Sequence, residues 1–339
     1  MAYIEFVDVN KSYGNNKVLK NINLSIEKND FVTLLGSSGC GKTTLLRCLA
    51  GLETIDSGKI ILDGEDITYK NPRDRNLGMI FQSYALFPTM NVFNNVAYGL
   101  KIKKTDKETI EKEVLNTLES VGLGDKVKSY PSQLSGGEKQ RVALARSIVM
   151  KPKVLLLDEP FSAIDAKLRR SLQIKFKELH KEYGMTSIMV THDQDEAMFM
   201  SDTIHLMKDG NVEQSGSPTD LYLQPKTQYV ASFMGNYNIL SGEEFSRLTK
   251  GKYMDSKSVV LRPETIEILL SKVRVDENKF YQFEGVIDDY IPQGNIVRFI
   301  ILIEGVKLNV DALIDNISNF SIGQKVYLNI SLEKILYFD

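Results

Sequence analysis

The sequence predicts an α/β chain with a parallel sheet, followed by a small all-β domain. Three short, mostly apolar runs at residues 31–35, 154–157 and 186–190 are typical of strands buried on both faces. Helical patterns precede the second and third runs, and such alternation indicates parallel βαβ units. After residue 238 the pattern changes to short strand-like segments divided by turn residues. We therefore expect one domain over residues 1–237 and a second over 238–339.

The other elements of the first domain follow from the spacing of apolar residues. Residues 3–9 and 22–26 alternate between apolar and polar side chains, which predicts short antiparallel strands near the N-terminus. Helical spacing over two later stretches predicts a mostly helical insertion at about residues 90–150, with helices over 104–121 and 137–150. A long helix over 165–183 ends at Gly184 and leads into the third buried strand.

The second domain is predicted to contain strands only. Its strand-like segments lie at residues 259–261, 283–287, 296–303, 306–310 and 326–330. Turn residues at 292–295 and 304–305 separate neighbouring segments. Short strands joined by tight turns are typical of a small barrel or sandwich.

Composition places the chain among ordinary globular proteins. It has 339 residues, of which 42% are hydrophobic and 25% are charged, and the length suits two to three domains of roughly 150 residues. Lys and Arg total 42 against 44 Asp and Glu, for a net charge of −2. This balance argues against a large basic surface, so nucleic acid is not expected as a partner.

The cysteines and the N-terminus suggest a reducing compartment. The spacing of Cys40 and Cys48 fits neither a disulfide framework nor a paired metal-ligand motif. The N-terminus lacks the features of a secretory signal, and no stretch approaches the roughly 18 apolar residues of a spanning helix. We expect the chain to stay in the cytosol and to reach a membrane only through another polypeptide.

A phosphate-binding loop follows the first buried strand. The sequence Gly-Ser-Ser-Gly-Cys-Gly-Lys-Thr fits the G-x-x-x-x-G-K-[ST] pattern and precedes a helix over residues 42–49. The glycines let backbone N–H groups converge on phosphate oxygens, and the helix N-terminus adds partial positive charge. Lys42 is expected to neutralise the β- and γ-phosphates, and Thr43 to place its hydroxyl on Mg²⁺. The predicted loop residues are Gly36, Ser37, Ser38, Gly39, Cys40, Gly41, Lys42, Thr43 and Thr44.

Two carboxylates end the second buried strand, at the edge where open α/β sheets bind ligands. Asp158 is expected to hold Mg²⁺ through its water shell. Glu159 is expected to polarise the attacking water as a general base. The alternative is an acidic turn in solvent after a core strand.

A second glycine pair opens a helix shortly before the acidic strand. Ser135, Gly136 and Gly137 predict another helix N-terminus that could face a phosphate. One nucleotide does not need two such N-termini. A head-to-tail pair of chains provides a geometric solution, since each copy then supplies its Ser135–Gly137 segment to the nucleotide of its partner.

Together these motifs resemble those of the ATP-binding-cassette (ABC) ATPases. The resemblance covers residues 11–195 most specifically and extends to about residue 235. It implies a P-loop NTPase core with a RecA-like parallel sheet, an antiparallel β subdomain and a helical insertion. It also implies ATP as substrate, Mg²⁺ as its companion ion, and hydrolysis in a homodimer.

The resemblance assigns roles to four more residues. Tyr13 matches the aromatic residue that stacks on adenine, and Gln82 matches the glutamine that contacts Mg²⁺ and the attacking water. Asp165 lies in the loop that crosses between protomers. His192 matches the switch histidine, which contacts the γ-phosphate beside Glu159. Taken singly, each residue also has an ordinary structural interpretation, such as a strand-end aromatic or a helix N-cap.

Three residues depart from the usual pattern of the family. They are Ser37 in the phosphate loop, Glu138 at the end of the signature, and Ile164 before Asp165. Because a carboxylate near a phosphate is repulsive, we expect the side chain of Glu138 to point away from the nucleotide.

An apolar stretch follows Gln82 and suggests a partner surface. In importers of the family this region takes a short coupling helix of the membrane subunit, which implies a permease contact at Tyr84, Leu86 and Phe87. The alternative is that these side chains seal the helical insertion against the core.

The second domain resembles the oligonucleotide/oligosaccharide-type (TOBE-type) β domain of maltose-, polyamine-, iron- and phosphonate-type importers, through the segment 261–264 and the strand pair near Gly294. We therefore expect an importer ATPase, peripheral on the cytoplasmic face of the membrane. A solute-binding protein outside the membrane would act with it indirectly. Iron(III), polyamines and organophosphonates are the favoured solutes. The alternative is a cassette that serves an exporter or acts as an ATP switch on a cytosolic assembly.

Overall fold

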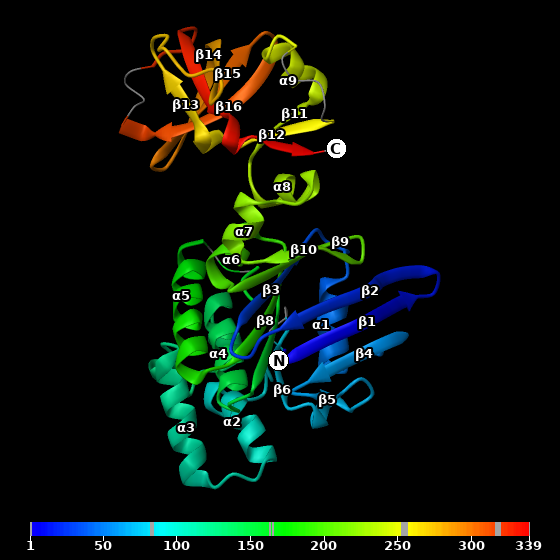
Figure 1. Cartoon of the computed structure of the whole chain (residues 1–339). Helices are drawn as coiled ribbons and strands as arrows, with labels where there is room; N and C mark the ends of the chain where they lie inside the picture. The colour runs from blue at the N-terminus through cyan, green and yellow to red at the C-terminus, as the bar shows by residue number, and fades with distance from the viewer. Residues whose placement is uncertain are drawn as a thin grey trace. The chain divides into compact units, whose positions relative to one another are not determined.

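The computed structural model describes residues 2–81, 85–162, 164, 166–251, 257–315 and 320–338. The chain divides into two compact units, Met1–Leu221 and Tyr222–Asp339 (Figure 1). The segment 222–237 therefore lies with the second unit. No helix among the described residues is long and apolar enough to span a bilayer.

A six-stranded sheet forms the centre of the first unit. Its strand order is β10 (Asn211–Gly216), β9 (Thr203–Lys208), β3 (Phe31–Gly36), β8 (Thr186–Thr191), β7 (Val154–Asp158) and β6 (Leu77–Ile80). β10 pairs antiparallel with β9, and the other neighbouring strands are parallel. Every residue of β3, β7 and β8 is buried, which confirms the three buried strands and the parallel sheet.

A second, antiparallel sheet shares an apolar cluster with the six-stranded sheet. It has the order β2 (Asn16–Ile26), β1 (Ile4–Tyr13), β4 (Ser57–Leu62) and β5 (Glu65–Asp66). Helix α1 (Lys42–Ala50) contributes Leu45, Leu46 and Leu49 to a cluster that includes side chains of both sheets. α1 is thus held rigidly at the phosphate loop.

Helices contribute to a second apolar cluster, together with β3, β6, β7 and β8. They are α2 (Val92–Ile102), α3 (Lys107–Ser120), α4 (Gly136–Ile148), α5 (Ala166–Tyr183) and α6 (Gln194–Met200). The helix expected at 104 begins only at Lys107, because Asp106 caps it by accepting a hydrogen bond from Thr109 N–H. The additional helix α2 occupies the start of the insertion.

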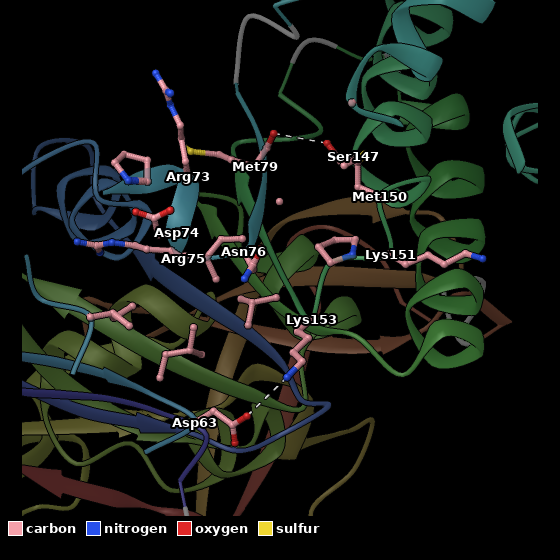
Figure 2. A pocket seen from close by; sticks show the side chains of 18 of the residues that line it. Asp63, Arg73, Asp74, Arg75, Asn76, Met79, Ser147, Met150, Lys151 and Lys153 are labelled. Carbon is pink, nitrogen blue, oxygen red and sulfur yellow. Dashed lines mark hydrogen bonds and ion pairs between the residues drawn. The ribbon is translucent and has the colours of Figure 1, made fainter. Parts of the chain in front are cut away.

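A groove of about 670 Å³ runs beside the edge strand β6 (Figure 2). Arg73 and Met79 line it near the β6 segment, while Tyr98 of α2, Arg146 of α4 and Met150 line it from the helical insertion. The groove therefore lies between side chains of the helical insertion and the segment that enters β6.

The second unit is an all-β domain with two short helices. A three-stranded sheet has the order β11 (Asn238–Ser241), β12 (Ser258–Leu261) and β18 (Leu336–Phe338). A curled five-stranded antiparallel sheet has the order β13 (Ile266–Leu269), β17 (Lys325–Ser331), β14 (Phe280–Gln293), β15 (Ile296–Ile303) and β16 (Val306–Leu313). Both sheets contribute buried side chains to one core around Phe299. The helices are α8 (Gln228–Met234) and α9 (Gly242–Leu248), and α7 (Pro218–Leu223) lies at the division between units.

Candidate nucleotide-binding site

The phosphate loop between β3 and α1 requires glycine at defined positions. Gly36 and Gly41 have φ angles of 152° and 104°. A Cβ atom at Gly41 would lie 2.8 Å from the carbonyl oxygen of Val18, and one at Gly36 would collide with the carbonyl oxygen of Met207. Only glycine accommodates both the left-handed backbone and the close neighbours. The loop is therefore built as a cradle into which backbone N–H groups can point.

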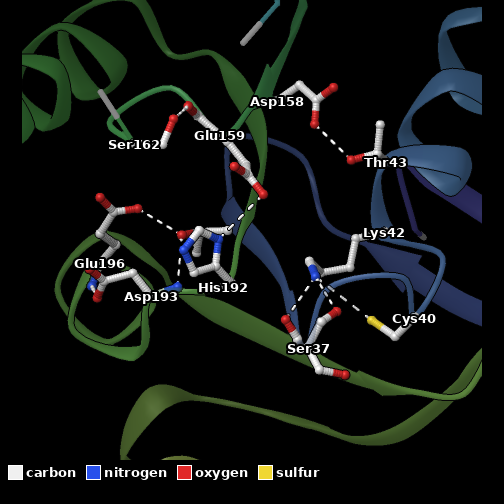
Figure 3. Close-up of polar contacts among 12 residues, drawn as sticks. Ser37, Cys40, Lys42, Thr43, Asp158, Glu159, Ser162, His192, Asp193 and Glu196 are labelled. Atoms are coloured by element: carbon white, nitrogen blue, oxygen red, sulfur yellow. Dashed lines mark hydrogen bonds and ion pairs between the residues drawn. The ribbon is translucent and has the colours of Figure 1, made fainter. Parts of the chain in front are cut away.

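Lys42 is the first residue of α1 and is almost completely buried, at 5% exposure. Its ammonium group donates to the carbonyl oxygens of Gly36 at 2.7 Å and Ser37 at 2.8 Å (Figure 3). The Nζ atom also lies 3.8 Å from the Sγ atom of Cys40. The cation is consequently held inside the loop, as the neutralisation of phosphate charge requires.

Thr43 and Asp158 form a pair of oxygen ligands next to this cation. The Thr43 hydroxyl donates to Oδ1 of Asp158 over 2.9 Å, from the start of α1 to the end of β7. Burial raises the pKa of Asp158, and the hydrogen bond from Thr43 opposes this rise. Hydroxyl and carboxylate oxygens suit Mg²⁺, which prefers oxygen ligands. The two residues therefore fit the predicted metal position.

Glu159 and His192 face each other from two neighbouring strands (Figure 3). Glu159 follows β7 with a left-handed φ of 47°, and its N–H donates to the carbonyl oxygen of Val190 at 3.0 Å. Its Oε1 atom lies 3.3 Å from Nδ1 of His192, which follows β8. Strained backbone of this kind concentrates at functional sites. The imidazole is 55% exposed, so it can reach a substrate.

Ser135 caps α4, the helix that begins with the predicted glycine pair. Its hydroxyl accepts a hydrogen bond from the Glu138 N–H at 3.3 Å, and Oε2 of Glu138 accepts from the Ser135 N–H at 2.8 Å. These hydrogen bonds, with Lys126 at 3.6 Å, lower the pKa of Glu138. The capping box thus holds the carboxylate of Glu138 against the backbone of Ser135. That Glu138 points away from a bound nucleotide stays a prediction. Among the described residues, no hydrogen bond joins Ser135 to the phosphate loop of its own chain.

Tyr13 ends β1 and is 47% exposed. Burial and the charge of Glu53 raise its pKa, and a hydrogen bond with Thr44 opposes them. Lys11 Nζ lies 5.2 Å from the centre of the Tyr13 ring. The ring thus stands beside the phosphate-loop helix with an accessible face.

Three predicted residues, Gln82, Tyr84 and Asp165, lie outside the described residues. Of the other expected permease contacts, Leu86 packs partly buried against the core. The ring centre of Phe87 lies 4.5 Å from that of Tyr98, a residue of the groove beside β6.

Comparison with known proteins identifies the family. The family described as "ABC transporter" matches residues 19–162. The chain is 46% identical over 295 residues to the spermidine/putrescine import ATP-binding protein PotA of Pasteurella multocida, covering 81% of this chain and 79% of that protein. It is 41% identical over 340 residues to PotA of Bacteroides thetaiotaomicron, covering 96% and 71%. The chain belongs to the ABC transporter family.

Solved ABC structures share the fold of the first unit. The structure of cbiO1 from Clostridium perfringens has a TM-score of 0.62 and 32% identity, covering 66% of this chain and 91% of that one. A dimeric ATP-binding cassette, MJ0796, bound to ADP and Pi, has a TM-score of 0.58 and 32% identity, covering 63% and 98%. The predicted fold, family and ATPase activity are confirmed.

The ABC site also contains a polar network that the sequence patterns did not reveal. Oε2 of Glu196 accepts a hydrogen bond from the Thr191 hydroxyl at 2.7 Å, and burial raises the pKa of Glu196. Asp193 caps α6, and Arg169 of α5 lies 3.3 Å from its Oδ2 atom. The Asp-x-x-Glu spacing at 193–196 is the one sequence signal that could have indicated this loop as an ordered helix start. The partner on α5 depends on the tertiary fold.

Proposed function

We propose that the chain is the ATP-hydrolysing subunit of an importer for polyamines. The ATPase part rests on one geometric observation, namely that the phosphate loop, Asp158, Glu159 and His192 converge at one end of the parallel sheet. The solute rests on relatives whose names specify spermidine and putrescine import. One of these relatives matches along 96% of the chain, β domain included.

Each residue of the site has a role in hydrolysis. Lys42 and the loop N–H groups hold the terminal phosphates, and Tyr13 stacks on adenine. Thr43, Asp158 and Gln82 hold Mg²⁺, which when bound offsets the negative charge of the phosphates. Glu159 accepts the proton of the attacking water, a role that contributes about 10²- to 10⁴-fold to the rate. His192 donates from its exposed ring to the γ-phosphate and keeps Glu159 in place.

The second half of the site comes from another copy of the chain. Ser135, Gly136 and Gly137 present the N-terminus of α4, whose N–H groups favour an anion. A head-to-tail dimer brings this N-terminus to the partner's nucleotide and lets Asp165 cross the interface. The dimeric form of the related cassette MJ0796 supports this arrangement.

The groove beside β6 is the proposed contact with the membrane permease. Phe87 lies next to Tyr98 and 5.5 Å below the guanidinium of Arg146, and both partners line the groove. Leu86 instead packs on the core, in line with the sealing role considered above for this stretch. A segment of the permease inserted here would sense any movement of the helical insertion. The chain then sits peripherally on the cytoplasmic face, acts indirectly with a solute-binding protein, and carries a β domain that braces the dimer.

Uptake of radiolabelled spermidine and putrescine tests this function. We expect deletion of the gene to abolish uptake, and the wild-type gene to restore it. The variant Lys42→Ala should restore none, because its phosphate site lacks the buried cation. Uptake that survives deletion, or that Lys42→Ala restores fully, contradicts the proposal. If the deletion strain loses only the uptake of iron(III) or of an organophosphonate, that compound is the solute. If the strain instead fails to export a compound, the chain serves an exporter.

A further inference from the structure

One guanidinium group joins two loops of the nucleotide site. Arg169 lies in the first turn of α5 and is about 30% exposed. Its Nη2 atom donates to the carbonyl oxygen of Ile164 at 3.0 Å, in the loop between β7 and α5. Its Nη1 atom donates to Oδ2 of Asp193 at 3.3 Å, in the loop between β8 and α6. The two loops follow neighbouring strands, and the contact between Glu159 and His192 also joins them.

The loop that holds Asp193 also carries His192. The Asp193 N–H donates to the Thr191 hydroxyl at 3.0 Å, and Oδ1 of Asp193 accepts from the Glu196 N–H at 3.1 Å. Arg169 Nε lies 3.9 Å from Oε1 of Glu196, at ion-pair rather than hydrogen-bond distance. Arg169 therefore contacts Asp193, the residue directly after His192, and lies near Glu196 of the helix that follows.

The loop that holds Ile164 begins at Glu159 and is bonded to its main-chain carbonyl oxygen. Ile164 is buried and follows Ser162, whose hydroxyl donates to the carbonyl oxygen of Glu159 at 3.1 Å. A guanidinium has a planar fork of N–H groups that can bind a carbonyl and a carboxylate together, whereas an ammonium is a point donor. The two hydrogen bonds of Arg169 thus depend on the planar guanidinium group, which lysine lacks.

We propose that Arg169 is a positioning residue for ATP hydrolysis, which ties the 162–165 loop to the His192 loop and so keeps His192 aligned with Glu159. The inference rests on the proposed roles of these two residues. Arg169 then keeps His192 aligned with Glu159 but does not contribute to ATP affinity.

Steady-state ATPase assays on the full chain test the proposal. Arg169→Ala should lower kcat about tenfold, while KM and the affinity for a fluorescent ATP analogue stay within about twofold. Arg169→Lys keeps the charge but cannot bridge both loops, so it should retain most of the defect. The matched control is Arg170→Ala. The guanidinium carbon of Arg170 lies 3.4 Å from the centre of the Phe199 ring in α6, and loss of Arg170 should leave kcat within about twofold.

A double-mutant cycle with Asp193→Asn separates positioning from general weakening. Asparagine retains the oxygen that caps α6 and removes the charge that faces Arg169. If Arg169 acts through this loop, the double variant should be no more than about twofold slower than Arg169→Ala. Melting temperatures should shift by no more than about 3 °C, which keeps a kinetic loss distinct from unfolding. If Arg169→Ala does not fold, the same cycle with Arg169→Lys applies.

Several outcomes overturn the proposal. These are wild-type kcat in Arg169→Ala, full activity in Arg169→Lys, and losses that multiply in the double variant. His192→Ala identifies which level fails. If His192→Ala keeps wild-type kcat, the proposed role of His192 fails and the inference with it. If His192→Ala is inactive and Arg169→Ala is not, only the inference fails.

Discussion

At the residue scale, one buried histidine makes the protein sensitive to pH. His205 in β9 is 3% exposed, and its Nδ1 atom lies 2.7 Å from the hydroxyl oxygen of Ser215. Its Nε2 atom has no hydrogen-bond partner among the described residues. Burial consequently lowers the pKa of His205 to about 4. A charged imidazole is incompatible with this position in the sheet.

We predict that His205 makes the protein less stable in mild acid. The unfolded histidine takes up its proton near pH 6.5, so between that pH and about 4 the unfolded state binds more protons. Stability therefore falls as the pH falls through this window. His205→Asn should remove up to about 3 kcal/mol of that fall, as measured by urea unfolding at about pH 7 and about pH 4.5. An unchanged difference between the two pH values would show that His205 is not the titrating group.

At the residue scale, the sequence revealed those residues whose role depends on local spacing. Lys42 and Thr43 follow a glycine pattern within one loop, and Asp158 and Glu159 end a recognisable buried strand. Arg169 was not predicted, because its carboxylate partner Asp193 lies in another loop that only the sheet order brings near. The capping box between Ser135 and Glu138 is a local interaction that the Ser-x-x-Glu spacing encodes, although the sequence analysis did not include it.

At the scale of elements, α1 has a predicted anion site at its N-terminus and an arginine at its C-terminus. Its N-terminus belongs to the phosphate loop, and at its C-terminus Arg75 donates to the carbonyl oxygens of Cys48 and Leu49, each at 2.8 Å. Arg75 also donates to the carbonyl oxygens of Thr68 at 2.9 Å and Lys70 at 3.0 Å. A cation at the C-terminus is favoured by the helix dipole, as an anion is at the N-terminus. Arg75 thereby ties α1 to the segment that enters β6.

We predict that Arg75→Met destabilises the first unit by about 2–4 kcal/mol. The substitution keeps an apolar stem but removes the guanidinium hydrogen bonds to four carbonyl oxygens, three of which are buried. Arg73→Met is the matched control, because Arg73 is exposed and should change stability by less than about 0.5 kcal/mol. Chemical unfolding followed by circular dichroism measures both. Equal stabilities of the two variants would mean that the hydrogen bonds of Arg75 make no net contribution.

The elements themselves were only partly predictable. β3, β7 and β8 were evident as apolar runs because they are buried on both faces. The edge strand β6 has only Ile80 fully buried, so its pattern is weak. β14 extends over Phe280–Gln293, well beyond the predicted 283–287, because pairing with β15 and β17 continues into its exposed ends. Such boundaries depend on pairing partners that are distant in sequence, and these partners cannot be predicted from local periodicity.

At the scale of the whole molecule, the proposed function divides each nucleotide site between two copies of the chain. The phosphate loop, Asp158, Glu159 and His192 form one half, and the α4 N-terminus at Ser135 forms the other. Glu138 accepts a hydrogen bond from the Ser135 N–H, and Lys126 lies 3.6 Å from the other oxygen of its carboxylate, so the start of this helix is ordered within one chain. The proposed head-to-tail dimer follows from the need to join the halves.

Trapping the dimer with ATP tests this central claim most directly. Glu159→Gln should bind ATP without hydrolysing it, and light scattering after size exclusion should then give twice the 38.3 kDa mass of one chain. Without ATP the same variant should be monomeric. Adding Ser135→Arg should prevent dimerisation while ATP still binds to the phosphate loop. A monomer in the presence of ATP, or a dimer that tolerates Ser135→Arg, would contradict a site shared between two chains.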